Sequence, residues 1–251
     1  MHELAPADAA RLTGWFADER PGPETAATHT LSVGIGHWWV DRWPEPRTVL
    51  VDCAGNYLLR GDPDAVSADQ LREIVHGFVD APPEFAPLLS RLSDRFLVWD
   101  RIMYELDEQW PGPADPGDVA VRPLRPDDTG AVERIDPSLI WIAKTWGGPA
   151  GLAASGHAWG AFVLGRLVSI ACTFFRGTRY EDIGVVTAPN LERRNLSTMC
   201  TTALCVDILA RGRRPCWSTT VDNLASRRVA EKSGFRWARD DVLYVVDIDL
   251  T

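Results

Sequence analysis

The chain has 251 residues, of which 45% are hydrophobic and 24% are charged, and its formal net charge is -9. This composition is typical of a globular protein with enough apolar sequence for one large core or two modest ones. The negative charge opposes extended contact with nucleic acid or with an anionic membrane surface, so we expect neither as a partner.

The five cysteines are odd in number and include no Cys-x-x-Cys pair, which argues against a disulfide framework and against a zinc site. The first residues lack the cationic start and apolar run of a secretory signal. No apolar stretch approaches the roughly 20 residues of a membrane span. We therefore expect a soluble, cytoplasmic protein that holds no metal.

The first part of the chain predicts short helices and strands. A helix is expected over residues 6–18, and Trp-rich extended sequence follows over residues 29–43. Two strands, 47–53 and 56–61, flank a turn at Ala54-Gly55-Asn56 that is typical of a hairpin.

Further along, Ser67 with Gln70 three residues later predicts a capping box, which would open a helix that runs to residue 79. Another helix is expected to start within residues 81–92. Residues 95–106 are strand or helix, because their apolar run is too short to decide. The lone histidines of this part are expected to be structural or solvated: His29, His37 and His76.

The clearest break in the chain is "WPGPADPGD", residues 110–118, where three prolines and two glycines exclude regular structure. We expect an N-terminal α/β domain over residues 1–110, a linker over 111–118 and a second domain over 119–251.

The second domain predicts strands that alternate with helices near its C-terminal end. Because crossover helices must pack on a sheet face, the sheet should be at least partly parallel there. The expected order is a strand ending in Pro-Asp-Asp near residue 128, a helix 129–135, a hairpin 158–175 turning at Gly165-Arg166, a strand 181–187, a helix 196–212, a strand 215–221, a helix 223–235 and a strand 241–250.

Four of these pieces occur in an order that resembles the GNAT superfamily of N-acetyltransferases. They are "VRPLRPDD", "WGAFVLGRLVSIACTFF", "DIGVVTAPNLERRNLSTMCTTAL" and, the most specific, "RPCWSTTVDNLASRRVAEKSGF". The resemblance is to a branch with an extra N-terminal domain. It implies an α+β fold with a mixed, partly parallel sheet flanked by helices and splayed between two central strands, plus a smaller α/β N-terminal domain. One interpretation of that domain is a degenerate copy of the same fold.

The resemblance also implies a site for acetyl-coenzyme A in the splayed opening of the sheet. One strand would offer backbone groups to the pantetheine arm, and the next helix would offer its N-terminal N–H groups and dipole to the pyrophosphate. The positions that match coenzyme contacts are Val185, Val186, Arg193, Arg194, Asn195, Leu196, Ser197, Thr198, Asn223 and Ser226.

The phosphate loop, "ERRNLS", departs from the family pattern at Glu192, Asn195 and Ser197, where relatives carry Arg or Gln, Gly, and Gly or Ala. Asn195 can preserve a left-handed turn at a cost of about 1 kcal/mol. A carboxylate at Glu192 repels a pyrophosphate unless Arg193 or Arg194 offsets it. The alternative is an ordinary helix start that is capped by Asn195 or stabilised by Glu192 and needs no ligand.

The general base is implied to be a carboxylate on the strand before this loop. Asp182 and Glu181 are neighbours there, and strand neighbours point to opposite faces, so one of them faces the opening. We favour Asp182. The alternative is a solvated carboxylate at the start of a strand.

The general acid of many GNAT proteins is a Tyr, and the matching position here is Ala230, which cannot donate a proton. Tyr244 is the substitute that we assign, and Tyr180 and Cys216 stay open as others. The acceptor pocket is implied to involve the region around Trp141 and Trp146, which either wall the pocket or fill the core; Lys144 is a weaker candidate.

The sequence therefore predicts an acyl-CoA-dependent N-acetyltransferase that acts on a small amine. The alternative is a non-catalytic module of the same fold, a coenzyme sensor or a scaffold, because the loop and acid positions all depart from the pattern. A third reading keeps the fold and uses a larger acyl chain or another acceptor. The oligomeric state stays open.

Overall fold

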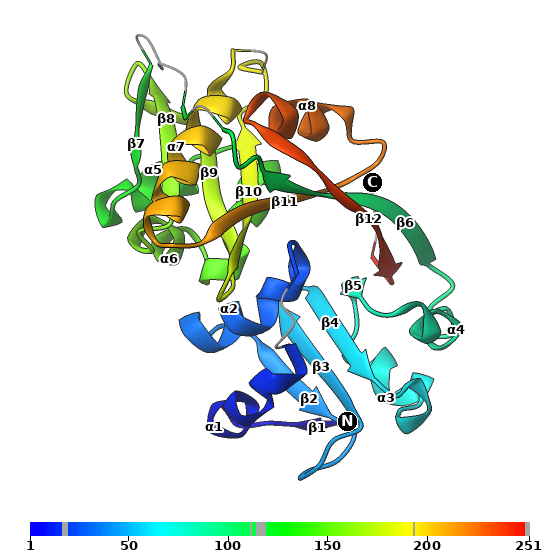
Figure 1. The fold of residues 1–251 in the computed structure, drawn as a ribbon. Coiled ribbons are helices and arrows are strands. Elements are labelled where there is room, and N and C mark those ends of the chain that lie inside the picture. Colours follow the sequence, from blue (N-terminus) through cyan, green and yellow to red (C-terminus); the bar gives the residue numbers. More distant parts are fainter. Residues whose placement is uncertain (17–19, 111, 114–118, 193, 249–251) are drawn as a thin grey trace.

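The computed structural model describes residues 1–16, 20–110, 112–113, 119–192 and 194–248. The strands of this part are β1 (His2–Glu3), β2 (His37–Val40), β3 (Thr48–Cys53), β4 (Asn56–Gly61), β5 (Gly77–Asp80), β6 (Phe96–Leu106), β7 (Ala120–Pro123), β8 (Ala158–Val163), β9 (Arg166–Arg176), β10 (Tyr180–Thr187), β11 (Arg214–Thr220) and β12 (Phe235–Val246). They form one mixed sheet, which confirms the expected mixed, partly parallel sheet (Figure 1).

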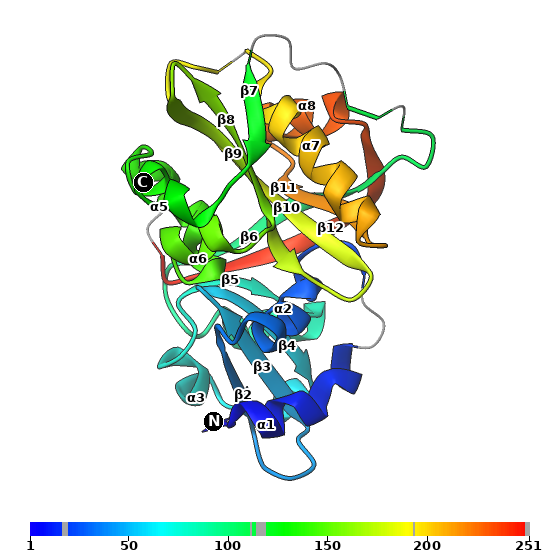
Figure 2. The same ribbon diagram turned by 90° about the vertical axis from the view of Figure 1, so that its left-hand side faces the viewer.

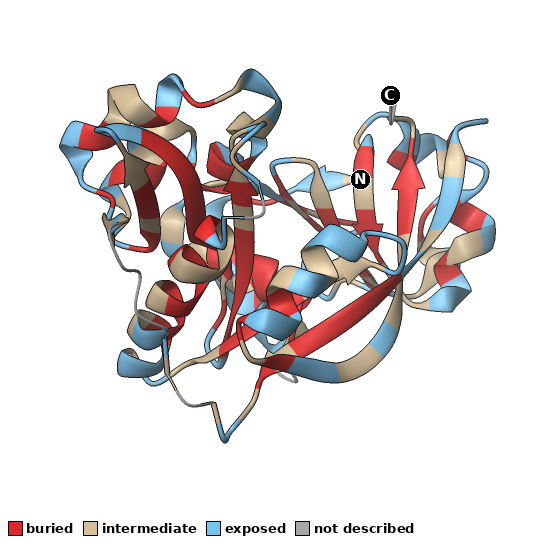
Figure 3. Cartoon of the chain, turned by 90° about the horizontal axis from the view of Figure 1, so that it is seen from above, coloured by how far each residue is buried: buried red, intermediate tan, exposed pale blue. Residues whose placement is uncertain are grey.

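Helices cover both faces of the sheet (Figure 2). Many of the buried residues lie on the strands beneath them (Figure 3). The α-helices are α1 (Pro6–Ala9), α2 (Ala26–Val33), α3 (Ala68–Arg72), α4 (Ala86–Leu89), α5 (Thr129–Glu133), α6 (Pro149–Ala154), α7 (Leu196–Ala210) and α8 (Leu224–Lys232). Apolar clusters under α1 and α2, α3 and α4, α5 and α6, and α7 and α8 make up the core.

The sheet has an internal pseudo-symmetry. Its strand order is β1-β2-β3-β4-β5-β12-β6-β11-β10-β9-β8-β7, and matching each strand with the one six places later in the chain reverses that order. We call residues 1–106 the N-half and residues 120–246 the C-half. In each half three antiparallel pairings lead to one parallel pair, β4 with β5 and β10 with β11.

The two halves exchange their last strands. β6 of the N-half pairs with β11, and β12 of the C-half pairs with β5, while β6 and β12 pair with each other between them. The strand β6 therefore lies before the predicted boundary but within the sheet of the C-half. The division into domains stays a prediction, and most of the linker expected at 111–118 lies outside the described residues.

In the N-half, the hairpin of β3 and β4 and the capping box are confirmed. Ser67 Oγ accepts from the N–H of Gln70 at 3.3 Å, and Gln70 Oε1 accepts from the N–H of Ser67 at 2.9 Å. The expected helix to residue 79 is wrong, because α3 ends at Arg72 and β5 follows. A Cβ on Gly77 would lie 2.2 Å from the carbonyl oxygen of Gly55, so glycine lets β5 start against the hairpin turn.

The expectation of extended structure over residues 29–43 is wrong in its first part. Residues 29–33 complete α2, which ends at Gly34 in a left-handed conformation with φ of 70°. His29 and Thr30 of this helix are buried against β3 and β9. The helix expected over residues 6–18 is α1 followed by a 3-10 helix to Phe16, and residues 17 and 18 lie outside the described part.

In the C-half the predicted strands and helices are confirmed, but the last strand begins at Phe235 rather than at residue 241 and ends at Val246. The hairpin of β8 and β9, the strand β10, the crossover α7, the strand β11, the helix α8 and the last strand β12 follow in the expected order. The ambiguous residues 95–106 are a strand, β6, which is long because it pairs on both sides.

Candidate active site

The parallel strands β10 and β11 separate after three residue pairs. Tyr180, Glu181 and Asp182 pair with β11, whereas residues 183–187 pair only with β9 in the described ladders. The ladder with β9 also shifts its register between Asp182 and Ile183. The sheet is thus splayed as expected, and Asp182 lies at the point where the two strands part.

The helix α7 starts beside this opening with a left-handed residue. Asn195 has φ of 58°, and its side chain makes no capping hydrogen bond with the described residues. The expected left-handed turn is confirmed, and the alternative in which Asn195 caps the helix is wrong. Because the first N–H groups of a helix have no partner within it, this end of α7 can receive an anion.

The charged residues of the loop before α7 point to solvent rather than to the core. Glu192 and Arg194 are exposed, as is Asn195 itself. Arg193, which the sequence assigned to the phosphate site, lies outside the described residues. A phosphate at the end of α7 would therefore meet the carboxylate of Glu192 unless the side chain turns away or a nearby arginine offsets its charge.

The other side chains predicted along the coenzyme path differ in whether they are buried in the core or partly exposed. Ser197 Oγ lies 2.7 Å from Thr187 Oγ1, a hydrogen bond that ties α7 to the end of β10. Leu196 and Val186 are buried in core clusters, so only their backbone groups can face a ligand. Val185 and Thr198 are half-buried.

Asn223 and Ser226 form the cap of α8. The Asn223 Oδ1 accepts from the N–H of Ser226 at 3.1 Å, and the Ser226 Oγ accepts from Trp217 Nε1 at 3.0 Å. Both side chains therefore stabilise the start of α8. A coenzyme contact by the same residues stays a prediction.

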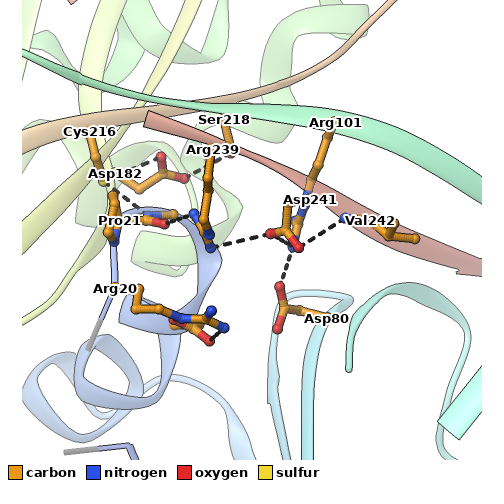
Figure 4. Close-up of polar contacts among 12 residues, drawn as sticks. Arg20, Pro21, Asp80, Arg101, Asp182, Cys216, Ser218, Arg239, Asp241 and Val242 are labelled. Carbon is orange, nitrogen blue, oxygen red and sulfur yellow. Dashed lines mark hydrogen bonds and ion pairs between the residues drawn. The ribbon is translucent and has the colours of Figure 1, made fainter. Parts of the chain in front are cut away.

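Asp182 is a buried carboxyl group with few polar neighbours (Figure 4). Its side chain is held by the hydroxyl of Ser218, at 3.4 Å, and by the thiol of Cys216, at 3.8 Å. Burial disfavours the charged form and raises the pKa of Asp182 to about 7, although the positive charge of Arg101 pulls it down. A carboxyl group with such a pKa can accept a proton near neutral pH.

Glu181 faces the other side of the sheet, as the alternation of strand side chains requires. Its oxygens accept from Arg211 Nε at 3.0 Å and Nη2 at 2.8 Å and from the hydroxyl of Thr173. Burial by itself would raise the pKa of Glu181, but these hydrogen bonds outweigh it and lower the pKa. Glu181 is therefore a fixed anion in an ion-pair cluster, which leaves Asp182 as the candidate base.

A cavity of about 100 Å³ lies beside Asp182, between the N-half and the C-half. It is lined by residues from both halves: Pro23, Ala26, Asn56, Tyr57, Leu58, Phe78, Asp80, Arg101, Phe174, Phe175, Asp182, Ser218 and Leu243. The contribution of the N-half to this site was not predicted from the sequence. Its residues carry no motif, and they reach Asp182 through the exchange of β6 and β12 and through the packing of α2 and residues 23–25 on β9 and β10.

Tyr244 does not join this site. It belongs to the apolar cluster under α3 and α4, where its ring stacks on Phe96 with centroids 5.9 Å apart, and it does not line the cavity. The assignment of Tyr244 as the general acid is therefore corrected. Ala230 is fully buried against α7 and β11, so this position serves packing.

The two tryptophans expected near the acceptor have different surroundings. Trp146 is buried and donates from Nε1 to the carbonyl oxygen of Thr173 at 2.7 Å, so it fills the core. Trp141 is 40% exposed and packs edge-on against Phe174, one residue of the cavity wall. Lys144 does not line the cavity.

The described part of the chain contains no group of three or more His, Cys, Asp or Glu residues that could hold a metal ion. In the same residues, no helix has both the length and the apolar character needed to cross a bilayer.

Comparison with known proteins points to one family. The family described as GNAT acetyltransferase matches residues 138–244. A protein of Streptomyces virginiae, named an uncharacterized N-acetyltransferase in the mutA 5′ region, is 42% identical over 212 residues, which cover 84% of this chain and 90% of that protein.

Two solved structures show how far the fold similarity extends. A GCN5-related N-acetyltransferase-like protein from Streptococcus suis aligns with a TM-score of 0.69 and 18% identity over 95% of this chain and 98% of that one. A tandem GNAT protein from the clavulanic acid biosynthesis pathway aligns with a TM-score of 0.59 and 14% identity over 97% and 96%. At these identities the likeness concerns the fold alone, and it includes both halves.

Proposed function

The chain belongs to the GNAT family of N-acetyltransferases, and on this premise we propose that it transfers the acetyl group of acetyl-coenzyme A to the amine of a small acceptor. The observation that carries the proposal is the position of Asp182, a buried carboxyl group at the point where β10 and β11 part. A base at this point can reach an amine that approaches a thioester lying in the opening.

Acetyl-coenzyme A supplies an activated acyl group, so the protein has to orient the amine and remove its proton. Asp182 takes that proton, because its raised pKa makes it a stronger base than an exposed carboxylate. Ser218 and Cys216 keep the carboxyl group in place. The coenzyme would be held by the backbone of residues 183–187, on the edge where no described strand pairs with them, and by the N–H groups at the start of α7.

The N-half is proposed to be a degenerate copy of the same fold that walls the acceptor pocket and binds no coenzyme of its own. Its support is the reversed strand order and the tandem GNAT protein among the similar structures. The helix α3, which matches α7 in that order, has five residues, and its capping box already uses the N–H groups of Ser67 and Gln70. Its start therefore offers fewer free N–H groups to a phosphate than the start of α7, where no described side chain caps the helix.

Titration calorimetry of the full chain with acetyl-coenzyme A, and with coenzyme A alone, tests the proposal. Saturable binding in the micromolar range is expected, followed by release of free thiol when amines are added. No detectable binding up to millimolar ligand would overturn it. Binding without turnover of any amine would favour the sensor interpretation, which the buried Ala230 at the usual acid position supports.

A charge reversal locates the phosphates in the same experiment. Glu192→Arg replaces an exposed carboxylate next to the start of α7 with a cation, so it should raise coenzyme affinity about tenfold at low salt. Glu73→Arg makes the same change on the exposed end of α3 and serves as the control. Equal effects of the two variants would mean that the phosphates do not lie at α7.

A further inference from the structure

The cavity beside Asp182 carries a second polar group that the proposed mechanism does not use. Arg101, on β6, lines this cavity and is only 3% exposed. Both of its hydrogen bonds use Nη2, to Asp80 and, at 3.0 Å, to Asp241. Its Nε is buried and has no partner among the described residues. Part of the donor capacity of this guanidinium is therefore unused.

Arg101 is the central cation in an alternating chain of ion pairs. These ion pairs join residues 20–80 to β6 and β12. They run in the order Arg20, Glu24, Arg60, Asp80, Arg101, Asp241 and Arg239. They contain four arginines and three carboxylates, so one positive charge is left over. Arg101 on β6 and Asp182 on β10 are separated by one strand, β11. Figure 4 shows both side chains, with the pairs of Asp80 and Asp241 below them.

The charge balance of the cavity changes when Asp182 accepts a proton. An ionised Asp182 offsets the excess positive charge, but a protonated Asp182 does not. Once the proton of the amine has moved to Asp182, an anionic group in the cavity would offset the charge instead. Arg guanidinium groups are well suited to bind a carboxylate, because their donors match its two oxygens.

We propose that the cavity selects acceptors whose amine is accompanied by a carboxylate, as in a small amino acid, with the amine at Asp182 and Ser218 and the carboxylate at Arg101. This inference rests on the proposed function, because it names the acceptor of that reaction. The rest of the wall consists mainly of apolar and aromatic side chains, including Tyr57, Phe78 and Phe174, which suits an apolar remainder. Arg101 is then a specificity-determining residue supplied by the exchanged strand β6.

Direct binding tests the inference without turnover. L-leucine and L-phenylalanine, each beside its decarboxylated amine, are titrated calorimetrically into the full chain in the absence of an acyl donor. We expect each amino acid to bind at least about tenfold more tightly than its amine, because a charged hydrogen bond to a buried guanidinium has that order of effect. Equal or weaker binding of the amino acids overturns the inference.

Arg101→Lys assigns the preference to this residue. Lysine keeps the charge for Asp80 and Asp241 but lacks the second set of donors, so the preference should fall to within about threefold. Arg236→Lys, at an exposed arginine of β12, should keep the full preference. A preference that survives Arg101→Lys contradicts the assignment. If that variant does not fold, the comparison of each amino acid with its amine on the wild-type protein still tests the inference.

The outcomes separate this inference from the proposed function. Acetylation of amines without any preference for a carboxylate would leave the acetyltransferase in place and remove the acceptor class. A preference for amino acids that depends on Arg101, without acetyl transfer from acetyl-coenzyme A, would keep the binding site and remove the proposed reaction.

Discussion

Asp182 destabilises the fold in the ionised form that the proposed reaction needs. A carboxylate buried beside Phe174 and Phe175 costs free energy whenever it is ionised, and its raised pKa expresses that cost. The fold tolerates the cost because Ser218, Cys216 and the charge of Arg101 offset part of it. A residue with only a structural role would gain nothing from this position.

Asp182→Asn separates the two effects. Removing the base should lower kcat at least about tenfold. The wild-type rate should rise as the pH passes about 7, where Asp182 loses its proton, and the variant should lose this rise. Rates measured from pH 5.5 to pH 9 with thiol detection check both points.

The same variant should raise stability at pH 8. The folded pKa of Asp182 is raised, so its contribution to stability is lost as the pH rises from the unfolded value toward 7, and a neutral Asn avoids the loss. We expect a gain of roughly 2–4 kcal/mol in urea unfolding. A variant that is both slower and less stable would mean that Asp182 holds the fold rather than the proton.

At the scale of the elements, the sequence predicted most of what depends on near neighbours. The Ala54-Gly55 turn, the Ser67 capping box and the crossover α7 are specified by residues close together in the chain. The splayed strands followed from the family resemblance. Asn195 in its left-handed turn was foreseen because Asn enters that region readily.

The elements that the sequence missed depend on distant partners. The start of β5 depends on Gly77, which fits under the carbonyl oxygen of Gly55. The capping box of Ser67 and Gln70, which lies before β5 in the sequence, predicts a helix there instead. β6 carries Arg101 to Asp182 only through pairing with β11 and β12. No local pattern reports such pairing, so the acceptor side of the site could not be found from the sequence.

Gly77→Ala tests the contact that begins β5. The added methyl group would lie 2.2 Å from the carbonyl oxygen of Gly55, so strand and turn must move apart. We expect a loss of about 1–3 kcal/mol in urea unfolding. Gly14→Ala is the control, because nothing lies within 4 Å of its added atom. Equal stabilities of the two variants would show that β5 does not depend on this approach.

At the scale of the whole molecule, buried polar groups join the halves. His29 lies on α2, and its Nε2 is 2.9 Å from the carbonyl oxygen of Thr145. Its Nδ1 accepts a hydrogen bond from the backbone N–H of Arg176. The ring is neutral, with its proton on Nε2. Burial lowers the pKa of His29 to about 4, since a charged imidazole would lose its solvation there.

This histidine should make the junction sensitive to acid. The unfolded chain binds a proton at His29 near pH 6.5, whereas the folded chain resists it down to about pH 4, so stability is lost as the pH falls through that window. His29 should account for about 2 kcal/mol of the loss between pH 7 and pH 5. Urea unfolding at both pH values measures it.

His29→Gln keeps a donor and an acceptor but does not titrate, so its loss between the two pH values should be smaller by that amount. His37→Gln, at an exposed histidine, is the control for the substitution itself. A His29→Gln variant with the same pH dependence as the wild type would show that other groups cause the acid sensitivity.

The exchange of β6 and β12 also has a consequence for how the chain is made. The N-half lacks its neighbour for β5 until residues 235–246 have left the ribosome, because β12 is the strand that covers that edge. During synthesis β5 therefore offers unpaired N–H and C=O groups, the kind of edge on which chains aggregate. Translation that slows before residue 235 prolongs this exposure and lowers the yield of native protein.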